Sequence, residues 1–234
     1  MKKTNQKGRF IVIDGIDGSG KATQVELLVK RLKKEGYNVA TIDFPQYYNN
    51  FFGKMTGRFQ NGDFGNAPET SSYLASVLYA ADRWETKSKI EKWLKEGKVV
   101  ILDRYVSSNQ IHQGGKIKNA KERKLFLEWL EEMEFEVFKI PRPELIVFLN
   151  VPYSISKKLL ETKNARDYLK NAKNDQVEKS RNYQEASHKQ SLKLIKEHNN
   201  WIEINCVEDN KMLNTEDIND LIWEEVKAFI NKKR

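Results

Sequence analysis

The segment that most constrains this fold is a glycine-rich turn between an apolar run and a helical pattern. The apolar run covers residues 10–13, the turn reads Gly15-Ile16-Asp17-Gly18-Ser19-Gly20-Lys21, and the helical pattern covers residues 24–34. A strand that feeds such a turn leaves unpartnered backbone N–H groups at the start of the helix. The glycines allow close approach of the backbone, and the lysine adds a positive charge. The segment therefore predicts a loop that binds nucleotide phosphates.

The residue after the lysine departs from the usual pattern of such loops. Ser or Thr normally stands there and supplies a hydroxyl group to magnesium, whereas this chain has Ala22, and Thr23 comes one place later. A glycine-rich turn without a ligand is the alternative interpretation. The strand, loop and helix context favours the nucleotide site.

Short apolar runs alternate with helical patterns along the rest of the chain. The runs at 10–14, 39–44, 99–102, 145–150 and 201–205 predict strands, and the patterns at 68–96 and 120–138 predict long helices. Such alternation is typical of parallel strands joined by crossover helices. We expect an α/β fold with a five-stranded parallel sheet flanked by helices, in a single domain spanning residues 1–234.

Two segments show no regular pattern. Residues 46–66 are rich in Asn, Gly, Tyr and Phe and follow the second strand, at the sheet edge where ligands bind in such folds. Residues 162–174 are charged and poor in apolar side chains, which predicts a lid over the site.

Composition limits the partners and the compartment. The 41 Lys and Arg against 33 Asp and Glu give a net charge of +8, which suits anionic ligands. The most basic stretch carries few aromatic residues for stacking on bases, so we expect no nucleic-acid partner. The apolar run at 10–13 is too short for a signal peptide or a membrane span. The single Cys206 excludes an intramolecular disulfide, and we expect a cytoplasmic protein.

A carboxylate and a guanidinium follow the third strand. Asp103 and Arg104 come directly after the run at 99–102, at the same sheet edge as the phosphate loop. Such an Asp can organise magnesium, and such an Arg can hold a phosphate. A surface ion pair between the two is the alternative.

At this point the chain resembles the thymidylate kinase family. The segments that carry the resemblance are Phe44-Pro45 with Tyr47, Tyr79 to Arg83-Trp84-Glu85, and Asp103-Arg104-Tyr105-Val106-Ser107-Ser108-Asn109 with Gln113-Gly114. Weaker matches are Glu134-Phe135 before Ile140-Pro141, and Asp175 with Glu178. The resemblance implies transfer of the terminal phosphoryl group of ATP to dTMP with Mg²⁺, which gives dTDP, and it implies a homodimer.

The resemblance also implies roles for individual residues. Lys21, Arg104, Asp17 and Arg166 would be catalytic, with Lys163 in reserve for Arg166. ATP would be bound by Gly15, Gly18, Ser19, Gly20, Lys21, Ala22 and Thr23. The substrate would be bound by Phe44, Pro45, Tyr47, Tyr79, Arg83, Arg104, Ser108, Asn109, His112 and Gln113. Asp103 would bind the metal, with Asp14 as a second candidate acting largely through water.

Within that substrate site, Tyr79 would stack on thymine, and Arg83 and Asn109 would bond its edge. Tyr79 and Phe44 have the alternative of being core residues, and Arg83 has that of a buried ion pair with a carboxylate. His112 stands where relatives commonly carry Tyr beside the sugar, which predicts a looser check on the second sugar carbon.

Three other functions stay open at this stage. A nucleoside kinase needs a carboxylate base, and none directly follows the second strand, although Asp17 or Asp43 could serve. A nucleic-acid-binding ATPase would need a basic groove with aromatic residues. A regulatory nucleotide binder without turnover is suggested only by Ala22.

Overall fold

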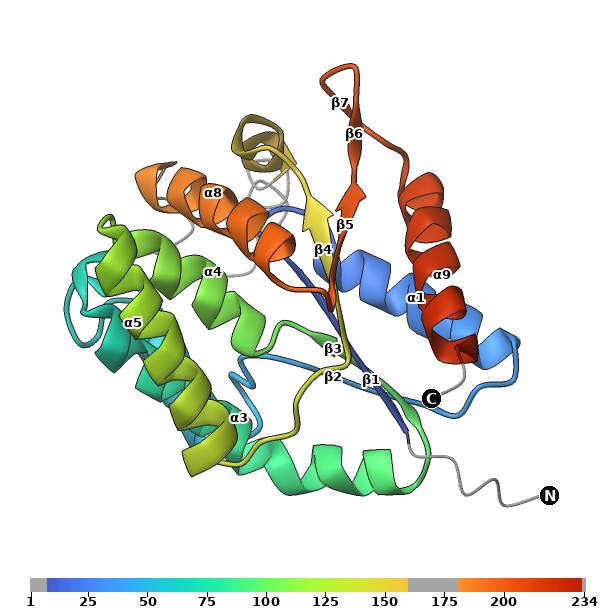
Figure 1. Cartoon of the computed structure of the whole chain (residues 1–234), viewed down its shortest axis with the longest axis horizontal. Helices are drawn as coiled ribbons and strands as arrows, with labels where there is room; N and C mark the ends of the chain where they lie inside the picture. The colour runs from blue at the N-terminus through green and yellow to red at the C-terminus, as the bar shows by residue number, and fades with distance from the viewer. Residues whose placement is uncertain (1–7, 160–180, 233–234) are drawn as a thin grey trace.

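A parallel sheet forms the centre of the protein, whose computed structural model describes residues 8–159 and 181–232. The five strands lie in the order β2–β3–β1–β4–β5 (Figure 1). Their bounds are β1 (Arg9–Gly15), β2 (Val39–Asp43), β3 (Val99–Asp103), β4 (Leu145–Asn150) and β5 (Trp201–Asn205). Each strand pairs in parallel with its neighbours. The predicted α/β fold and its five strands are therefore confirmed.

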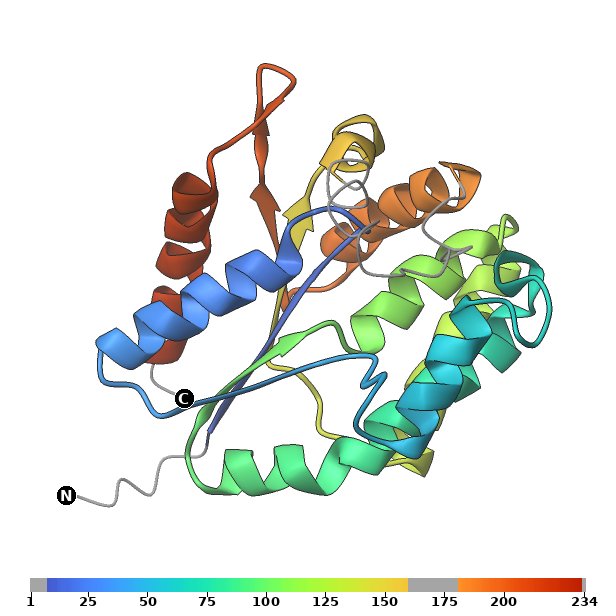
Figure 2. The same cartoon turned by 180° about the vertical axis from the view of Figure 1, so that it is seen from behind.

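Helices cover both faces of the sheet (Figures 1 and 2). On one face lie α1 (Lys21–Lys34) and α9 (Thr215–Asn231), and on the other lie α3 (Ser72–Lys95), α4 (Val106–Lys116), α5 (Ala120–Glu131) and α8 (Arg181–Glu197). Alternate residues of β1 serve the two cores, because successive side chains of a strand point to opposite faces. Ile11 and Ile13 belong to the core under α1, and Phe10 and Val12 belong to the core under α3.

The segment predicted to be irregular contains a helix, so that prediction was wrong. After the loop at 46–50, α2 (Phe51–Gln60) begins at Asn50, whose side chain accepts a hydrogen bond from Gly53 N. Two backbone N–H groups of the first turn donate to Glu85 of α3. A Cβ on Gly53 would lie 2.0 Å from Gln46 O, so this glycine allows close packing of the helix on the loop.

The other helical predictions needed smaller corrections. A 3₁₀ turn (η1, Ala67–Glu69) precedes α3, so the long helix starts at Ser72. The predicted helix at 120–138 changes from α5 to a π-helical turn (η2, Glu132–Val137). A short antiparallel pair, β6 (Val207–Glu208) and β7 (Lys211–Met212), follows β5. The predicted lid at 162–174 lies outside the described residues.

Candidate functional site

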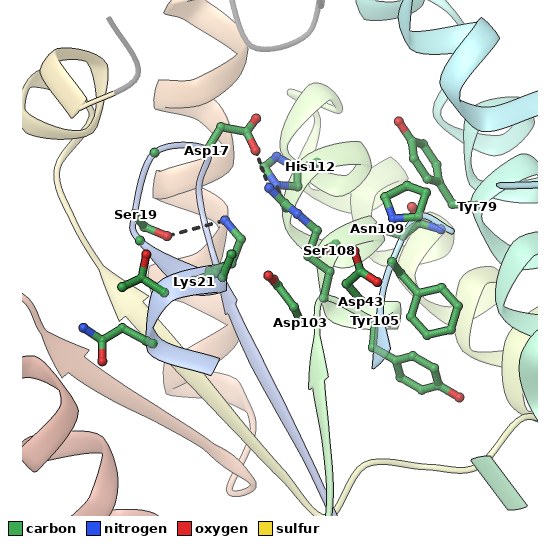
Figure 3. Close-up of a pocket in the computed structure, with 18 of the residues that line it drawn as sticks. Asp17, Ser19, Lys21, Asp43, Tyr79, Asp103, Tyr105, Ser108, Asn109 and His112 are labelled. Carbon is green, nitrogen blue, oxygen red and sulfur yellow. Dashed lines mark hydrogen bonds and ion pairs between the residues drawn. The ribbon is translucent and has the colours of Figure 1, made fainter. Parts of the chain in front are cut away.

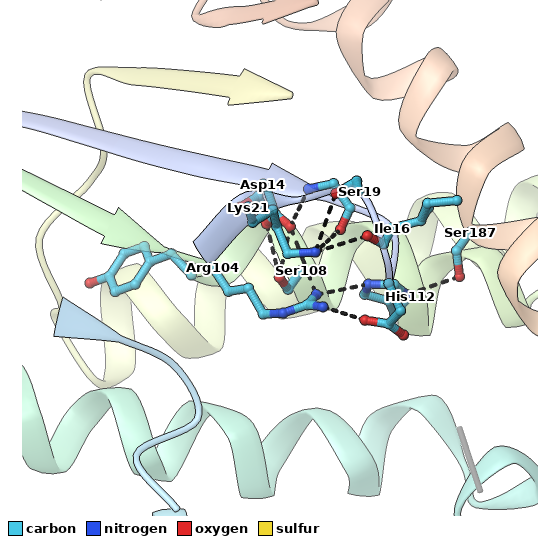
Figure 4. A network of polar contacts seen from close by, with 12 residues as sticks. Asp14, Ile16, Ser19, Lys21, Arg104, Ser108, His112 and Ser187 are labelled. Atoms are coloured by element: carbon cyan, nitrogen blue, oxygen red, sulfur yellow. Dashed lines mark hydrogen bonds and ion pairs between the residues drawn. The ribbon is translucent and has the colours of Figure 1, made fainter. Parts of the chain in front are cut away.

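The glycine-rich turn joins β1 to α1 as predicted and holds its lysine close to the backbone. Gly18 and Gly20 have φ of 78° and 85°, a region that favours glycine. Lys21 Nζ donates to Ile16 O at 2.8 Å and to Gly15 O at 3.0 Å (Figure 4). Burial and the nearby Arg104 together lower the pKa of Lys21 to about 8, although neighbouring carboxylates oppose the shift. The ammonium group therefore lies where an anion would stabilise its charged form.

A cavity of about 760 Å³ runs from this turn across the carboxyl edge of the sheet (Figure 3). Most residues singled out from the sequence line it: Asp17, Gly18, Ser19, Gly20, Lys21, Ala22, Thr23, Phe44, Pro45, Tyr47, Tyr79, Arg83, Asp103, Arg104, Ser108, Asn109, His112 and Gln113. Asp14 and Gly15 lie behind this lining. Arg166 and Lys163 lie outside the described residues.

Arg104 forms an ion pair with Asp17, and both residues line the cavity. Gln184 Nε2 donates to the other carboxylate oxygen of Asp17 at 2.6 Å. Burial alone would raise the pKa of Asp17, but Arg104 and the other nearby positive groups hold it well below its ordinary value. Arg104 itself has a φ of 67°, which is unusual for a residue with a side chain. The ion pair therefore joins the phosphate loop to the end of β3.

His112 lies on the other side of the Arg104 guanidinium. Arg104 NH1 lies 3.2 Å from His112 Nε2, and since arginine can only donate, Nε2 accepts. The ring proton is then on Nδ1, which donates to Ser187 Oγ at 3.0 Å. The ring also stacks on Tyr183 with an interplanar angle of 3°. Burial lowers the pKa of His112 to about 4, so the imidazole is neutral at pH 7.

The two aspartates predicted as metal ligands have different surroundings. Asp14 is fully buried and accepts hydrogen bonds from Gly15 N, Ser107 and Ser108, so its carboxylate is satisfied behind the cavity. Asp103 lines the cavity, and its buried Oδ1 has no hydrogen-bond partner among the described residues. Burial raises the pKa of Asp103. Asp103 therefore fits a magnesium ligand, and Asp14 fits a structural group.

Aromatic residues form the end of the cavity remote from Lys21 (Figure 3). Phe44 is 5% exposed and belongs to the core as well as to the cavity wall, so both interpretations of this residue hold. Tyr79 meets Phe59 of α2 edge-on at 6.4 Å between ring centroids, and its hydroxyl accepts from Gln60 Nε2 at 3.2 Å. Tyr47 donates to Gln60 at 2.6 Å. These contacts fix the aromatic rings that line this end of the cavity, the aromatic slot.

Arg83 and Asn109 supply polar groups at this same end. Arg83 is in fact in a buried ion pair with Glu134 of the π-helical turn, as the alternative interpretation held, yet it still lines the cavity. Asn109 Nδ2 donates to Ser76 O at 3.3 Å. Gln113 Nε2 lies 3.4 Å from the Tyr183 hydroxyl. The structure thus brings the predicted base-binding residues together.

Several lining residues were missed by sequence reasoning. They are Gln24, Gln60, Asp82, Leu159, Tyr183, Met212, Leu213, Thr215 and Ile218. Three apolar members, Met212, Leu213 and Ile218, come from the segment that runs from β7 into α9. Asp82 is 1% exposed and directly precedes Arg83, so a carboxylate in an apolar helix face was the signal that could have revealed it.

Among residues 8–159 and 181–232, no helix combines the length and the apolar character needed to cross a membrane. Within the same ranges, no group of three or more His, Cys, Asp or Glu side chains could hold a metal ion by itself. Asp103 is thus not part of such a cluster within these ranges.

Comparisons with known proteins agree with this geometry. The profile of a family described as thymidylate kinase matches residues 13–218. A probable thymidylate kinase of Thermococcus onnurineus is 39% identical over 64% of this chain and 69% of its own length. The thymidylate kinase of Mycobacterium tuberculosis is 32% identical over 61% of this chain and 65% of its own length. The chain thus spans about two thirds of the length of these curated relatives in each alignment.

A solved structure of thymidylate kinase from Candida albicans has the same fold. It superposes with a TM-score of 0.72 at 21% sequence identity, and the superposition covers 97% of this chain and 95% of that one. The resemblance drawn from the motifs is therefore confirmed by the profile match, which spans most of the chain. The chain belongs to the thymidylate kinase family.

Proposed function

We propose that this chain, as a single domain, transfers the terminal phosphoryl group of ATP to the phosphate of dTMP and so forms dTDP and ADP. One observation carries the proposal: a single cavity joins the phosphate loop at Lys21 to an aromatic slot that contains Arg83 and Asn109. Arg104 lines the same cavity and pairs with Asp17 of the phosphate loop, and the two phosphate groups would meet beside it. Family membership supports the same reaction.

The chain's own residues would act by alignment and by charge. A phosphate monoester is largely ionised near neutral pH, so its attack needs no general base. Lys21 would leave the loop carbonyls for the outer phosphates of ATP, and Arg104 would hold the acceptor phosphate. Asp17 would position Arg104 through their ion pair. Arg166 is proposed as a further cation at the transferring group.

Mg²⁺ is proposed as the cofactor. Asp103 would hold it together with water and ATP phosphates, which suits the octahedral oxygen coordination of this ion, and the ion would neutralise charge on the phosphates. The buried, unpartnered Oδ1 of Asp103 supports this assignment.

A coupled assay of ADP release tests the function. ATP and Mg²⁺ are supplied with dTMP, dUMP, dCMP, AMP or GMP, and thymidine and ATP alone serve as controls. Turnover strongest with dTMP supports the proposal. Turnover with thymidine would instead identify a nucleoside kinase that uses Asp17 or Asp43 as a base. ATP binding without turnover on any monophosphate would identify a nucleotide binder, and hydrolysis stimulated by DNA or RNA a nucleic-acid-dependent ATPase.

A homodimer paired through α3 is proposed as the working assembly. Leu74, Val77 and Trp84 lie on one side of this helix and are 66%, 40% and 51% exposed. An exposed apolar stripe on a long helix favours pairing with a second copy. Light scattering tests it: the double variant Leu74→Glu, Trp84→Glu should give half the wild-type mass, whereas Leu221→Glu on α9 should not. A monomeric wild type would refute the dimer.

The cellular setting is proposed to be the cytoplasm. Cys206 is buried, and burial raises its pKa to about 12. The thiol is therefore protonated and unreactive near neutral pH, which suits a reduced structural cysteine in a reducing compartment. Fractionation of the source cells would test this.

A further inference from the structure

Glu134 has no role in the proposed phosphoryl transfer, yet it is fully buried beside the aromatic slot. It belongs to the π-helical turn η2, where one extra residue in the turn changes the direction of the side chains. A buried carboxylate is costly unless it is paired and hydrogen-bonded. Its partners therefore show what the turn holds in place.

Glu134 accepts hydrogen bonds from two of the three guanidinium nitrogens of Arg83. Arg83 Nε donates to Glu134 Oε2 at 3.1 Å, and Arg83 NH2 donates to Glu134 Oε1. Such a two-point contact fixes the plane of a guanidinium as well as its position. The third nitrogen, NH1, donates to Tyr105 O at 3.4 Å and carries a second hydrogen. Toward a ligand in the cavity, Arg83 can therefore act only as a hydrogen-bond donor.

Glu134 also orients Asn109. The Asn109 amide interacts with the Glu134 carboxylate, and its Nδ2 donates to Ser76 O at 3.3 Å, so the nitrogen side of the amide is directed at these two acceptors. A carboxylate beside the amide repels the amide oxygen, so the reversed orientation is disfavoured. Asn109 is 3% exposed and lines the cavity, and its free group for a ligand is the acceptor Oδ1.

We propose that Glu134 is a positioning residue that sets base specificity by holding Arg83 as a donor and Asn109 as an acceptor. The proposal rests on the function proposed above. Thymine and uracil present a keto oxygen beside an N3–H, which matches a donor next to an acceptor. Cytosine presents an amino group beside an unprotonated N3, so the donor and acceptor positions of its edge are the reverse of those of thymine. Arg83 and Asn109 therefore favour binding of thymine and uracil and disfavour binding of cytosine.

The test compares kcat and KM for dTMP and dCMP in wild type, Glu134→Gln and Glu136→Gln. Glu136 lies in the same turn, is exposed and pairs only with Arg142 among the contacts described, so it is the matched control. Glu134→Gln should raise KM for dTMP about 10- to 100-fold, the effect of losing a charged hydrogen bond, while KM for ATP stays within about twofold. The dTMP to dCMP ratio of kcat/KM should fall at least about tenfold. Glu136→Gln should match wild type.

A folded Glu134→Gln protein with the wild-type ratio and KM would overturn the proposal. Thermal unfolding reports whether the variant folds. If it does not, Glu134→Asp takes its place, because it keeps the charge beside Arg83 and shortens the reach; its ratio should fall in the same direction, and an unchanged ratio would overturn the proposal. Wild type that does not turn over dTMP would instead refute the proposed function, which separates the two failures.

Discussion

Arg104 and His112 meet at 3.2 Å through a nitrogen that can only donate and a ring nitrogen that must accept. The same ring is held from behind by Ser187 and Tyr183 of α8. The guanidinium proposed to bind the acceptor phosphate is thus aimed by a neutral histidine as well as by Asp17.

Replacing His112 should weaken acceptor binding. His112→Phe removes the acceptor for Arg104 NH1, so KM for dTMP should rise about tenfold, while KM for ATP stays within about twofold. Steady-state kinetics measure both constants. Ser187→Ala keeps the ring and loses only its Nδ1 partner, so it should show a smaller rise. An unchanged KM for dTMP in His112→Phe would refute this role.

His112→Tyr separately tests whether His112 affects discrimination between deoxyribose and ribose. A larger ring fills more space beside the second sugar carbon, so the preference for dTMP over its ribose counterpart should increase several-fold. Equal preference in wild type and His112→Tyr would remove His112 from the sugar site. The ratio of kcat/KM for the two nucleotides is the measurement.

The same histidine should make folding stability depend on pH. The pKa of His112 falls from an ordinary 6.5 to about 4 on folding, so the unfolded chain binds a proton that the folded chain does not. Stability from this group is present above pH 6.5 and is lost as pH falls toward 4, by about 3 kcal/mol. Urea unfolding of wild type and His112→Phe at pH 7 and pH 4.5 measures it. Parallel losses in the two proteins would contradict the prediction.

Lys21→Met should separate binding from chemistry. The variant removes a charge proposed to act on the transferring phosphates, so kcat should fall about 1,000-fold. Among the residues that the structure describes, Nζ bonds to loop groups such as Gly15 O and Ile16 O, so dTMP binding by calorimetry should stay within about twofold. A kcat within about tenfold of wild type would exclude the proposed role.

Magnesium dependence should respond to Asp103 and Ala22 in opposite directions. Asp103→Asn weakens a ligand, so the Mg²⁺ concentration for half-maximal rate should rise about tenfold. Ala22→Ser adds the missing hydroxyl and should lower it several-fold. A titration of rate against Mg²⁺ at fixed ATP measures both. No shift in Ala22→Ser would show that this position does not limit metal binding.

Gly53→Ala should destabilise the wall of the cavity. Its Cβ would lie 2.0 Å from Gln46 O and 2.4 Å from Asn50 Oδ1, so the loop or α2 must move. The free energy of unfolding should fall by about 1–3 kcal/mol in urea titrations. Gly57→Ala meets its first neighbour, Tyr47 Cδ1, at 3.2 Å and should cost less. Equal stability of the two variants would contradict this packing.

The sheet and the loop could be predicted because their signals are local. Residues 145–149 of β4 are a continuous apolar stretch, and the glycine-rich turn directly follows β1. Helix α2 was missed because two glycines and exposed aromatics hide its period, although Asn50 was a readable cap.

The ion pair of Arg83 at the aromatic end of the cavity could be predicted from the sequence only as an alternative to base binding, and its carboxylate partner could not be identified. Arg83 and Glu134 are 51 residues apart, and the π-helical turn that brings them together has no simple pattern. His112 and Ser187 are 75 residues apart and meet only when α4 packs on α8. The sequence therefore predicted many of the residues that line the cavity, but not the partners that hold them.

Arg104 shows how stability and activity compete at one backbone position. Its φ of 67° is a conformation that glycine adopts freely and that costs a residue with a side chain about 1–2 kcal/mol. Selection for stability alone would place glycine after β3. The retention of arginine there marks a trade-off, and efforts to raise the melting temperature of this protein by optimising backbone propensities should leave this residue untouched.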